Sequence, residues 1–326
     1  MSEDMTGLRR KIASASDLKT VVRSMKALAA ASIGQYERAV AALVHYEHTV
    51  NLGLGVALRT IRLQGSPQPD ATTAPAPSGR LLRAVVFGSD QGLVGPFNER
   101  VAQHTKAILT DLQGTLLGQE AQVWAVGERV HESLEDVGLH PQGQFNMPAS
   151  VNDIGLLVGQ ILSQTSSADP DQAELHLFYN KTDPQALWGS VNQRLLPLDD
   201  TWRQSIEQRQ WPAMPLPELI GDTTAGLGAL VREHLFVSVF RACAESLASE
   251  NLSRLAAMER ADRNIEELLH ILNASFHHKR QASIDAEMFD VIAGFDALSV
   301  RKIHQTAFNL WACTEATMPP KPSQCP

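Results

Sequence analysis

Proline is missing from two long segments of this 326-residue chain, since residues 1–66 and 218–318 contain none of its 17 prolines. Glycine is also absent between Ala229 and Ala293. Proline removes a helix hydrogen bond and glycine weakens a helix interior, so these absences predict long uninterrupted helices at both ends. At about 1.5 Å per residue the C-terminal run is on the order of 100 Å long. A globular helix averages only about 11–12 residues, so a compact domain does not explain this length.

Other features that are scarce exclude whole classes of protein. Three cysteines make no disulfide framework, and the composition fits a reducing compartment. The chain has no apolar run of about 18 residues, so we expect no membrane-spanning helix. The first residues lack the apolar core of a secretory signal. A net charge of -8 argues against a nucleic-acid-binding protein, which presents a basic surface.

The charge is unevenly distributed along the chain. Residues 1–66 carry 9 basic and 5 acidic side chains, whereas residues 67–217 carry 9 and 17. The first predicted helix is therefore basic, and the excess acid lies in the middle of the chain.

Apolar residues in both terminal segments repeat with a period close to 3.5 residues, which is typical of supercoiled helices. The C-terminal series is Ala244, Ala248, Asn251, Leu255, Met258, Asp262, Ile265, Leu269, Leu272 and Phe276. The N-terminal series includes Leu8, Ile12, Ala15, Leu18, Val22, Met25, Ala29, Ser32, Tyr36 and Ala39. The simplest interpretation is that the two helices pair with each other, antiparallel. Two unrelated amphipathic helices on a globular core remain an alternative.

The middle of the chain alternates between predicted strands and helices. The predicted strands are Leu81–Phe87, Ala121–Val126, Glu174–Tyr179 and Trp188–Leu198, and the predicted helices are Asn98–Leu117 and Val151–Ser163. This alternation predicts a small, Rossmann-like α/β sheet with helices on both faces, inserted between the two long helices. The predicted division is a coiled-coil helix at 1–64, a flexible connector at 65–80, the α/β domain at 81–200, a return loop at 201–217, a coiled-coil helix at 218–294 and an extension of unknown role at 295–326.

A glycine-rich turn, from Gly88 to Gly95, follows the first predicted strand, where dinucleotide folds bind pyrophosphate. Its spacing is G-x-x-x-G-x-x-G, and neither the G-x-G-x-x-G fingerprint nor the phosphate-binding loop motif occurs. We expect a tight turn before a helix that starts at Pro96 or Asn98. An α/β enzyme that binds a nucleotide at this turn is the weakest alternative.

The histidines give no metal-binding pattern. His277 and His278 are adjacent on a helix, so their side chains diverge, and His45 and His48 lack the H-E-x-x-H pattern or a carboxylate partner. No nucleophile–base set is apparent. The sequence therefore predicts no catalytic residues, no cofactor and no metal, and a mechanical or scaffolding role.

Three separated blocks resemble the gamma subunit of F-type rotary ATP synthases. The first block is Leu8-Arg-Arg-Lys-Ile-Ala-Ser14 with Met25 and Ala29–Ser32. The second is the turn Ser89-Asp-Gln-Gly-Leu-Val-Gly95. The third is Glu245-Ser-Leu-Ala-Ser-Glu250, Arg254, Ala257-Met258 and Asn264, followed by Arg280-Gln-Ala-Ser-Ile284 and Glu287. Residues 100–220 resemble the family only in their layout.

The resemblance implies a central stalk that turns inside a ring of alpha and beta subunits and couples ion flow to ATP synthesis or hydrolysis. It implies contacts with that ring, with the epsilon subunit and with the membrane c-ring, at the cytoplasmic face of a bacterial inner membrane and without insertion into it. By position, Arg23, Met25 and Lys26 face acidic loops on beta. Arg280 and Gln281 match the positions at which the family's C-terminal helix hydrogen-bonds a loop of the beta subunit, a contact called the catch. Glu287 is the last residue of the same motif. A helical-hairpin adaptor without an ATPase partner is the alternative function.

Departures from the family pattern suggest a divergent bacterial member, of the kind found in the alternative sodium- or proton-translocating ATPases. Gln91 replaces a basic residue of the turn, Asp285 replaces a threonine, and Lys26 lies where an acid is common. The family's chain commonly ends shortly after a segment that matches Ile292-Ala-Gly294, whereas this chain continues to Pro326.

Overall fold

A computed structural model gives the fold of the chain. The residues that it describes are 2–63, 81–115, 121–165, 173–198, 200–209, 211–212, 217 and 220–315. The connector predicted at 65–80 lies outside them. The chain divides into two units, residues 22–261 and residues 1–21 together with 262–326. Two long helices, α1 (Ser2–Leu63) and α6 (Thr223–Glu315), contribute residues to both units.

Heptad spacing of the buried side chains confirms the predicted periodicity of both helices. On α1, buried residues recur seven apart at Ala15, Val22, Ala29 and Tyr36, and on α6 at Ala244, Asn251, Met258 and Ile265. In a helix, positions seven apart lie on one face, so each helix presents one continuous stripe for burial.

Polar contacts within each unit show that α1 and α6 run antiparallel. In residues 22–261, the Tyr46 hydroxyl donates to Glu233 at 2.7 Å, and Lys26 lies 3.5 Å from Glu259. In the other unit, Lys279 pairs with Asp4 at 2.6 Å. Partner numbers fall on α6 as they rise on α1, which is the pattern of an antiparallel pair.

Residues 81–196 supply a five-stranded sheet with the order β3-β2-β1-β4-β5. The strands are β1 (Leu81–Phe87), β2 (Gln122–Val126), β3 (Gly143–Phe145), β4 (Ala173–Asp183) and β5 (Leu187–Leu196). The pairs β1–β2, β1–β4 and β2–β3 are parallel, and only the β4–β5 hairpin is antiparallel.

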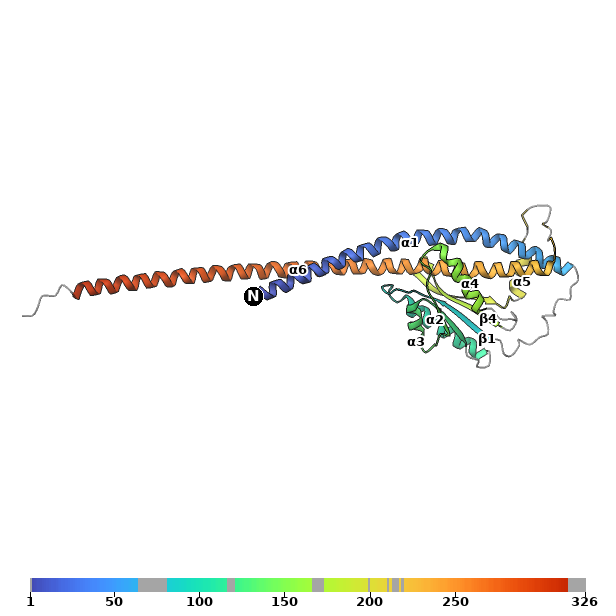
Figure 1. Ribbon diagram of the computed structural model, residues 1–326, viewed down its shortest axis with the longest axis horizontal. Helices are drawn as coiled ribbons and strands as arrows, with labels where there is room; N and C mark the ends of the chain where they lie inside the picture. The colour runs from blue at the N-terminus through green and yellow to red at the C-terminus, as the bar shows by residue number, and fades with distance from the viewer. Residues whose placement is uncertain are drawn as a thin grey trace, which may run out of the picture. The chain divides into compact units, whose positions relative to one another are not determined.

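Helices cover both faces of this sheet (Figure 1), as the alternating pattern predicted. One face packs on α2 (Phe97–Thr115) and α3 (Glu128–Asp136). The other packs on α4 (Ile154–Thr165), which follows a short 3-10 helix at Val151–Asp153, and on the part of α6 around Cys243. Tyr36 of α1 joins this second cluster, so the long helices are part of the core.

The structure adds three elements that the sequence analysis missed. Strand β3 has three residues, of which only Phe145 is buried, and so it carries no apolar run. Helix α3 has nine residues and buries only Val130 and Leu134. Helix α5 (Asp200–Glu207) lies where the first part of the return loop 201–217 was expected. The predicted start of that loop, at residue 201, is therefore wrong. Ile206 of α5 packs beside Val50 and Leu54 of α1.

Helix α6 continues past Gly294 to Glu315, into the extension that begins at residue 295. Residues 316–326 lie outside the described residues. Among the described helices, none is long and apolar enough to cross a bilayer.

Replacing Ile161 by alanine should test the packing of α4 on the sheet. Ile161 is fully buried in the core, so Ile161→Ala leaves a cavity and should lower the free energy of unfolding by about 2–5 kcal/mol. Leu156 lies on the same helix and is 72% exposed, so Leu156→Ala should change it by less than about 0.5 kcal/mol. Urea denaturation measures both. Equal losses in the two variants would contradict the orientation of α4.

Candidate functional site

The glycine-rich turn after β1 is fastened to α6 and to α2. The Ser253 hydroxyl of α6 donates to the backbone oxygen of Val94 at 2.6 Å. At the other end of the turn, the backbone N–H of Ser89 donates to Asn98 Oδ1 at 3.0 Å, and Asn98 Nδ2 donates to Ser89 Oγ at 2.9 Å. Helix α2 begins at Phe97, between the two predicted start positions. The turn therefore joins the sheet to the long helix.

Asp90 ties this turn to the neighbouring strand connections. Its carboxylate accepts the backbone N–H of Glu128 at 3.1 Å and that of Met147 at 3.0 Å. Glu128 is the first residue of α3, so Asp90 supplies a cap to a helix end that has no side-chain cap of its own. A single carboxylate thus fixes the turn, the start of α3 and the segment after β3.

The place where an α/β sheet binds nucleotides is filled by side chains. The strand order reverses direction between β1 and β4, and ligands of open α/β folds bind beyond the strand ends at such a point. Here β4 continues past its pairing with β1, and the Val94, Phe97 and Trp188 side chains form a buried cluster there. Asn180 Nδ2 donates to the backbone oxygen of Phe97 at 3.0 Å. This geometry favours a structural turn over a nucleotide site.

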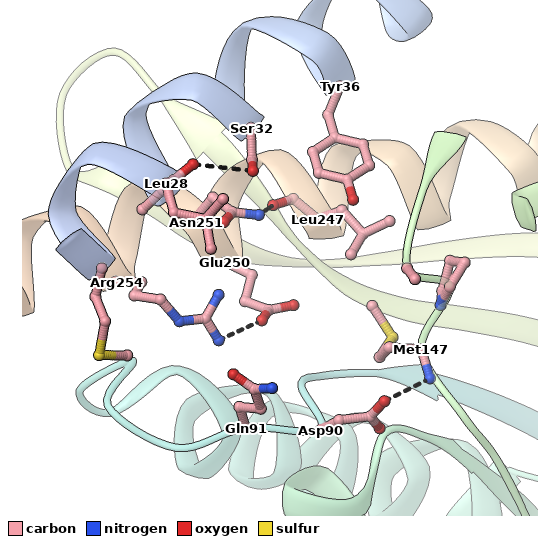
Figure 2. Close-up of a pocket in the computed structure, with 14 residues that line it drawn as sticks. Leu28, Ser32, Tyr36, Asp90, Gln91, Met147, Leu247, Glu250, Asn251 and Arg254 are labelled. Atoms are coloured by element: carbon pink, nitrogen blue, oxygen red, sulfur yellow. Dashed lines mark hydrogen bonds and ion pairs between the residues drawn. The ribbon is translucent and has the colours of Figure 1, made fainter. Parts of the chain in front are cut away.

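A cavity of about 370 Å³ lies between α1, α6 and the turn. Figure 2 shows Glu250 and Arg254 of α6 and Asp90 and Gln91 of the turn around it. Arg254 Nη2 donates to Glu250 Oε1 at 2.6 Å. The four-residue spacing of this pair places both side chains on one face of α6. All three sequence blocks of the resemblance meet here, because Met25 also lines the cavity.

Burial dominates the electrostatics of Glu250. It raises the pKa of the Glu250 carboxyl to about 7, although the Arg254 guanidinium lowers it and the charge of Asp90 raises it further. Burial likewise raises the pKa of Tyr36, which lines the same cavity. A carboxyl with such a pKa exchanges its proton near neutral pH.

The three candidate contact residues on α1 lie within one helical turn. Arg23 is exposed, while Met25 and Lys26 are partly buried. Lys26 Nζ is 3.5 Å from Glu259 Oε1 of α6, and Met25 and Asp90 both line the cavity. Lys26 therefore has an acidic neighbour within the chain.

The candidates Arg280, Gln281 and Glu287 lie on α6, in the unit formed by residues 1–21 and 262–326, and all three are exposed. Within the part of the chain that the structure describes, the side chains of these three residues form no hydrogen bond or ion pair. They belong to a different unit from Arg23, Met25 and Lys26.

Comparisons with known proteins identify the family. Residues 4–298 match the family model described as ATP synthase. The chain belongs to the ATP synthase gamma family. The ATP synthase gamma chain of Phocaeicola vulgatus is 25% identical over 293 residues, covering 88% of this chain and 97% of the relative. That of Paramagnetospirillum magneticum is 27% identical over 295 residues, covering 89% and 98%.

Solved ATP synthases share the fold of this gamma-family chain. A chain of the Euglena gracilis mitochondrial ATP synthase has a TM-score of 0.56 and 16% identity, covering 93% of this chain and 97% of that one. A chain from the central stalk and c-ring structure of Tetrahymena thermophila mitochondrial ATP synthase has a TM-score of 0.51 and 18% identity, with 74% and 99% covered. Membership in this family confirms the predicted central-stalk role and does not favour the adaptor alternative.

Sequence reasoning used Asp90, Glu250 and Arg254 to recognise the gamma family but did not unite them in one site. The spacing of Glu250 and Arg254 could have indicated their ion pair. Nothing local to the sequence places Asp90 beside them, because the turn reaches α6 only through the folded sheet. Among the described residues, no three histidine, cysteine or acidic side chains are grouped so as to hold a metal ion.

Glu250→Gln should alter how stability depends on pH. The folded chain keeps the Glu250 proton up to a pKa of about 7, whereas the unfolded chain releases it near 4.5. The folded state therefore binds more protons in this window, and its stability declines as the pH rises. Glutamine carries no such proton, so the wild type should lose stability relative to Glu250→Gln between those two pH values.

Urea denaturation across this pH window measures the difference between the two proteins. Glu267→Gln, at an exposed position of α6, is the matched control and should follow the wild type. A constant difference between the wild type and Glu250→Gln would contradict the raised pKa of Glu250.

Proposed function

We propose that this chain is the rotating shaft of a bacterial ATP synthase or ATPase, and that it transmits work between the membrane ring and the catalytic ring without a catalytic site of its own. The family match over residues 4–298 carries this proposal. The filled switch point of the sheet supports the second part, since Val94, Phe97 and Trp188 occupy the place where nucleotides bind in related layouts.

A shaft must resist bending and twisting, and the paired ends of α1 and α6 supply stiffness. Within the unit formed by residues 1–21 and 262–326, Lys19 pairs with Glu266 at 2.6 Å and Lys279 with Asp4 at 2.6 Å. The Arg9 guanidinium lies 5.4 Å from the centre of the Phe276 ring. These contacts join the two helices at intervals along the unit, so that they act as one rod.

The part of α6 beyond these contacts is suited to a surrounding sleeve. Six large apolar side chains there are 47–73% exposed: Ile284, Met288, Phe289, Val291, Ile292 and Phe295. An exposed apolar patch of this kind marks an interaction surface. We assign it to the interior of the alpha–beta ring, where an apolar bearing allows rotation without fixed polar bonds.

Transmission of torque from the ring to α6 also requires polar contacts beside the apolar surface. Arg280 and Gln281 lie directly before Ile284 and are exposed, so their donors can reach a beta-subunit loop. A guanidinium presents a rigid fork of donors that matches a carboxylate. Arg23, Met25 and Lys26 are assigned to a second contact, with acidic beta loops, and Glu287 to the same catch as Arg280.

We assign the α/β domain and the region around α5 to the foot that contacts the epsilon subunit and the c-ring. On this proposal the complex lies at the cytoplasmic face of the bacterial inner membrane. Relatives at 24–27% identity agree with a divergent member, and the substitutions Gln91, Asp285 and Lys26 suggest the alternative sodium- or proton-translocating branch.

Substitution of Arg280 tests the catch in the assembled enzyme. Arg280→Ala removes a charge-assisted contact of about 1.5–3 kcal/mol, so protons or sodium ions pumped per ATP hydrolysed should fall. Arg280→Lys should restore this ratio only in part, because an ammonium lacks the two-pronged geometry. Ion uptake into membrane vesicles and ATP hydrolysis, measured on one preparation, give the ratio.

His278→Ala is the matched control, since His278 is exposed two residues away and has no assigned role. Circular dichroism should show the same helix content in all variants. An unchanged pumping ratio in Arg280→Ala would remove Arg280 from the catch. Failure of the wild-type chain to co-purify with alpha and beta subunits would overturn the proposed function itself.

A further inference from the structure

A second cavity, of about 420 Å³, lies under α5, away from the Glu250 site. Its walls come from α1, α6, the end of β5 and α5 itself, and it lies wholly within residues 22–261. Ile206 and Trp202 of α5 pack against Val50 and Leu54 of α1, which fixes α5 as the cover of the cavity. Pockets for small organic molecules in proteins are typically about 300–1,000 Å³, so the volume is sufficient for one.

Two buried polar side chains in this cavity each have one atom without a hydrogen-bond partner within the described part of the chain. Asn51 is 3% exposed and its Oδ1 makes no hydrogen bond, and His234 is 8% exposed and its Nδ1 makes none. Asn51 lies on α1 and His234 on α6, and both line the same cavity. Buried polar atoms in folded proteins are nearly always paired, so two such atoms at one cavity call for an occupant.

The lining combines positive charge with polar groups that can both donate and accept hydrogen bonds. Groups that can both donate and accept are provided by Asn51, His234, Gln193, Ser205 and Ser238. Burial lowers the pKa of His234, which favours the neutral ring. A neutral imidazole donates a hydrogen bond from one nitrogen and accepts one at the other. Such walls match hydroxyl groups, since a hydroxyl also donates and accepts.

The charged groups at the same cavity favour an anion. Glu47 is already paired, because Arg241 Nη1 donates to Glu47 Oε2 at 2.8 Å. Of the two arginines on the lining, Arg194 has an interaction of its own, and the exposed Arg209 supplies the guanidinium for an anion. Arg59 Nη2 donates to the backbone oxygen of Arg209 at 3.2 Å, which holds the segment that carries this guanidinium against α1.

We propose that this cavity binds a small hydroxylated organic anion of the sugar phosphate or sugar acid class. Its hydroxyl groups pair with Asn51 and His234 inside, and its phosphate or carboxylate meets Arg209 at the mouth. Trp202, whose ring lies 5.1 Å from that of His234, provides a flat wall for the carbon skeleton. Binding at this site links α5 to both long helices and so stiffens the base of the α1–α6 pair.

Calorimetric titration of the full chain with ribose 5-phosphate and with gluconate tests the site. At least one of the two should bind saturably with one-to-one stoichiometry. Neutral ribose and inorganic phosphate, each with half of the required chemistry, should bind at least about tenfold more weakly than that anion. Absence of saturable binding by both anions at millimolar concentrations would overturn the proposal, and would leave water as the occupant.

Three variants locate the binding. Arg209→Gln should weaken it about tenfold or more by removing a charge-assisted contact, and Arg232→Gln, exposed on α6 and off the cavity lining, should not. Asn51→Leu and His234→Phe should abolish binding without lowering the thermal midpoint of the unliganded chain, because Asn51 Oδ1 and His234 Nδ1 have no hydrogen bond to lose and phenylalanine keeps a ring beside Trp202. Binding that survives in these two variants would place the ligand elsewhere and contradict the proposal. These results are independent of assembly with alpha and beta subunits.

Discussion

One buried stretch of α6 joins the sheet, α4 and α1 within residues 22–261. Residues 242–251 are all buried between the sheet, α4 and α1. Alanine, cysteine and serine predominate there, so the helix can lie close to the strands without leaving voids. Because the helix comes so close, the Ser249 hydroxyl can donate to the backbone oxygen of Asn180 at 2.6 Å. The α/β domain is therefore fastened to the long helix through both apolar packing and backbone acceptors.

This fastening changes what an otherwise familiar sheet can do. In a nucleotide-binding fold, the turn after the first strand opens toward a ligand. Here the equivalent turn accepts a hydrogen bond from Ser253 of α6. The Asp90 carboxylate accepts hydrogen bonds from backbone N–H groups of the same domain. The backbone N–H groups of Glu128 and Arg129, at the start of α3, are engaged by Asp90 and by the backbone oxygen of Ser89. The sheet has become a rigid attachment for a long helix, which fits a part that transmits force.

Glu250 loses hydration because the contact between the turn and α6 lies in the interior. Its carboxyl is buried, and the one guanidinium beside it does not offset the loss of hydration. With a pKa of about 7, protonation of Glu250 changes the charge beside the turn near neutral pH, whereas the exposed ion pairs nearer the ends of the helices are screened by water.

Much of this fold could be predicted from the sequence, and the failures have physical causes. The buried strands Leu81–Phe87 and Gln122–Val126 appear as apolar runs, and the long helices follow from heptad spacing and missing prolines. The short strand at Gly143–Phe145 and the helix at Asp200–Glu207 bury too few side chains to leave a pattern, and only tertiary contacts stabilise them.

The two cavities, like the elements of the fold, could be predicted from the sequence only in part. The four-residue spacing of Glu250 and Arg254 could have indicated a pair on one helix face, yet their meeting with Asp90 depends on sheet topology. The cavity lined by Asn51 and His234 could not have been foreseen, because these two residues are 183 positions apart in a chain whose α1–α6 register is set by packing. Local patterns indicate elements, whereas cavities depend on how the elements close on one another.

On the proposed function, this chain turns inside a ring of catalytic subunits. Such rotation can be observed on single molecules of the chain assembled with alpha and beta subunits fixed to a surface, with a bead attached through Glu99→Cys on the exposed side of α2. Cys243 is buried, and replacing Cys313 and Cys325 by serine leaves one accessible attachment point. The account predicts stepwise rotation of the bead in one direction when ATP is added. A bead that stays still while the same complex hydrolyses ATP would contradict it.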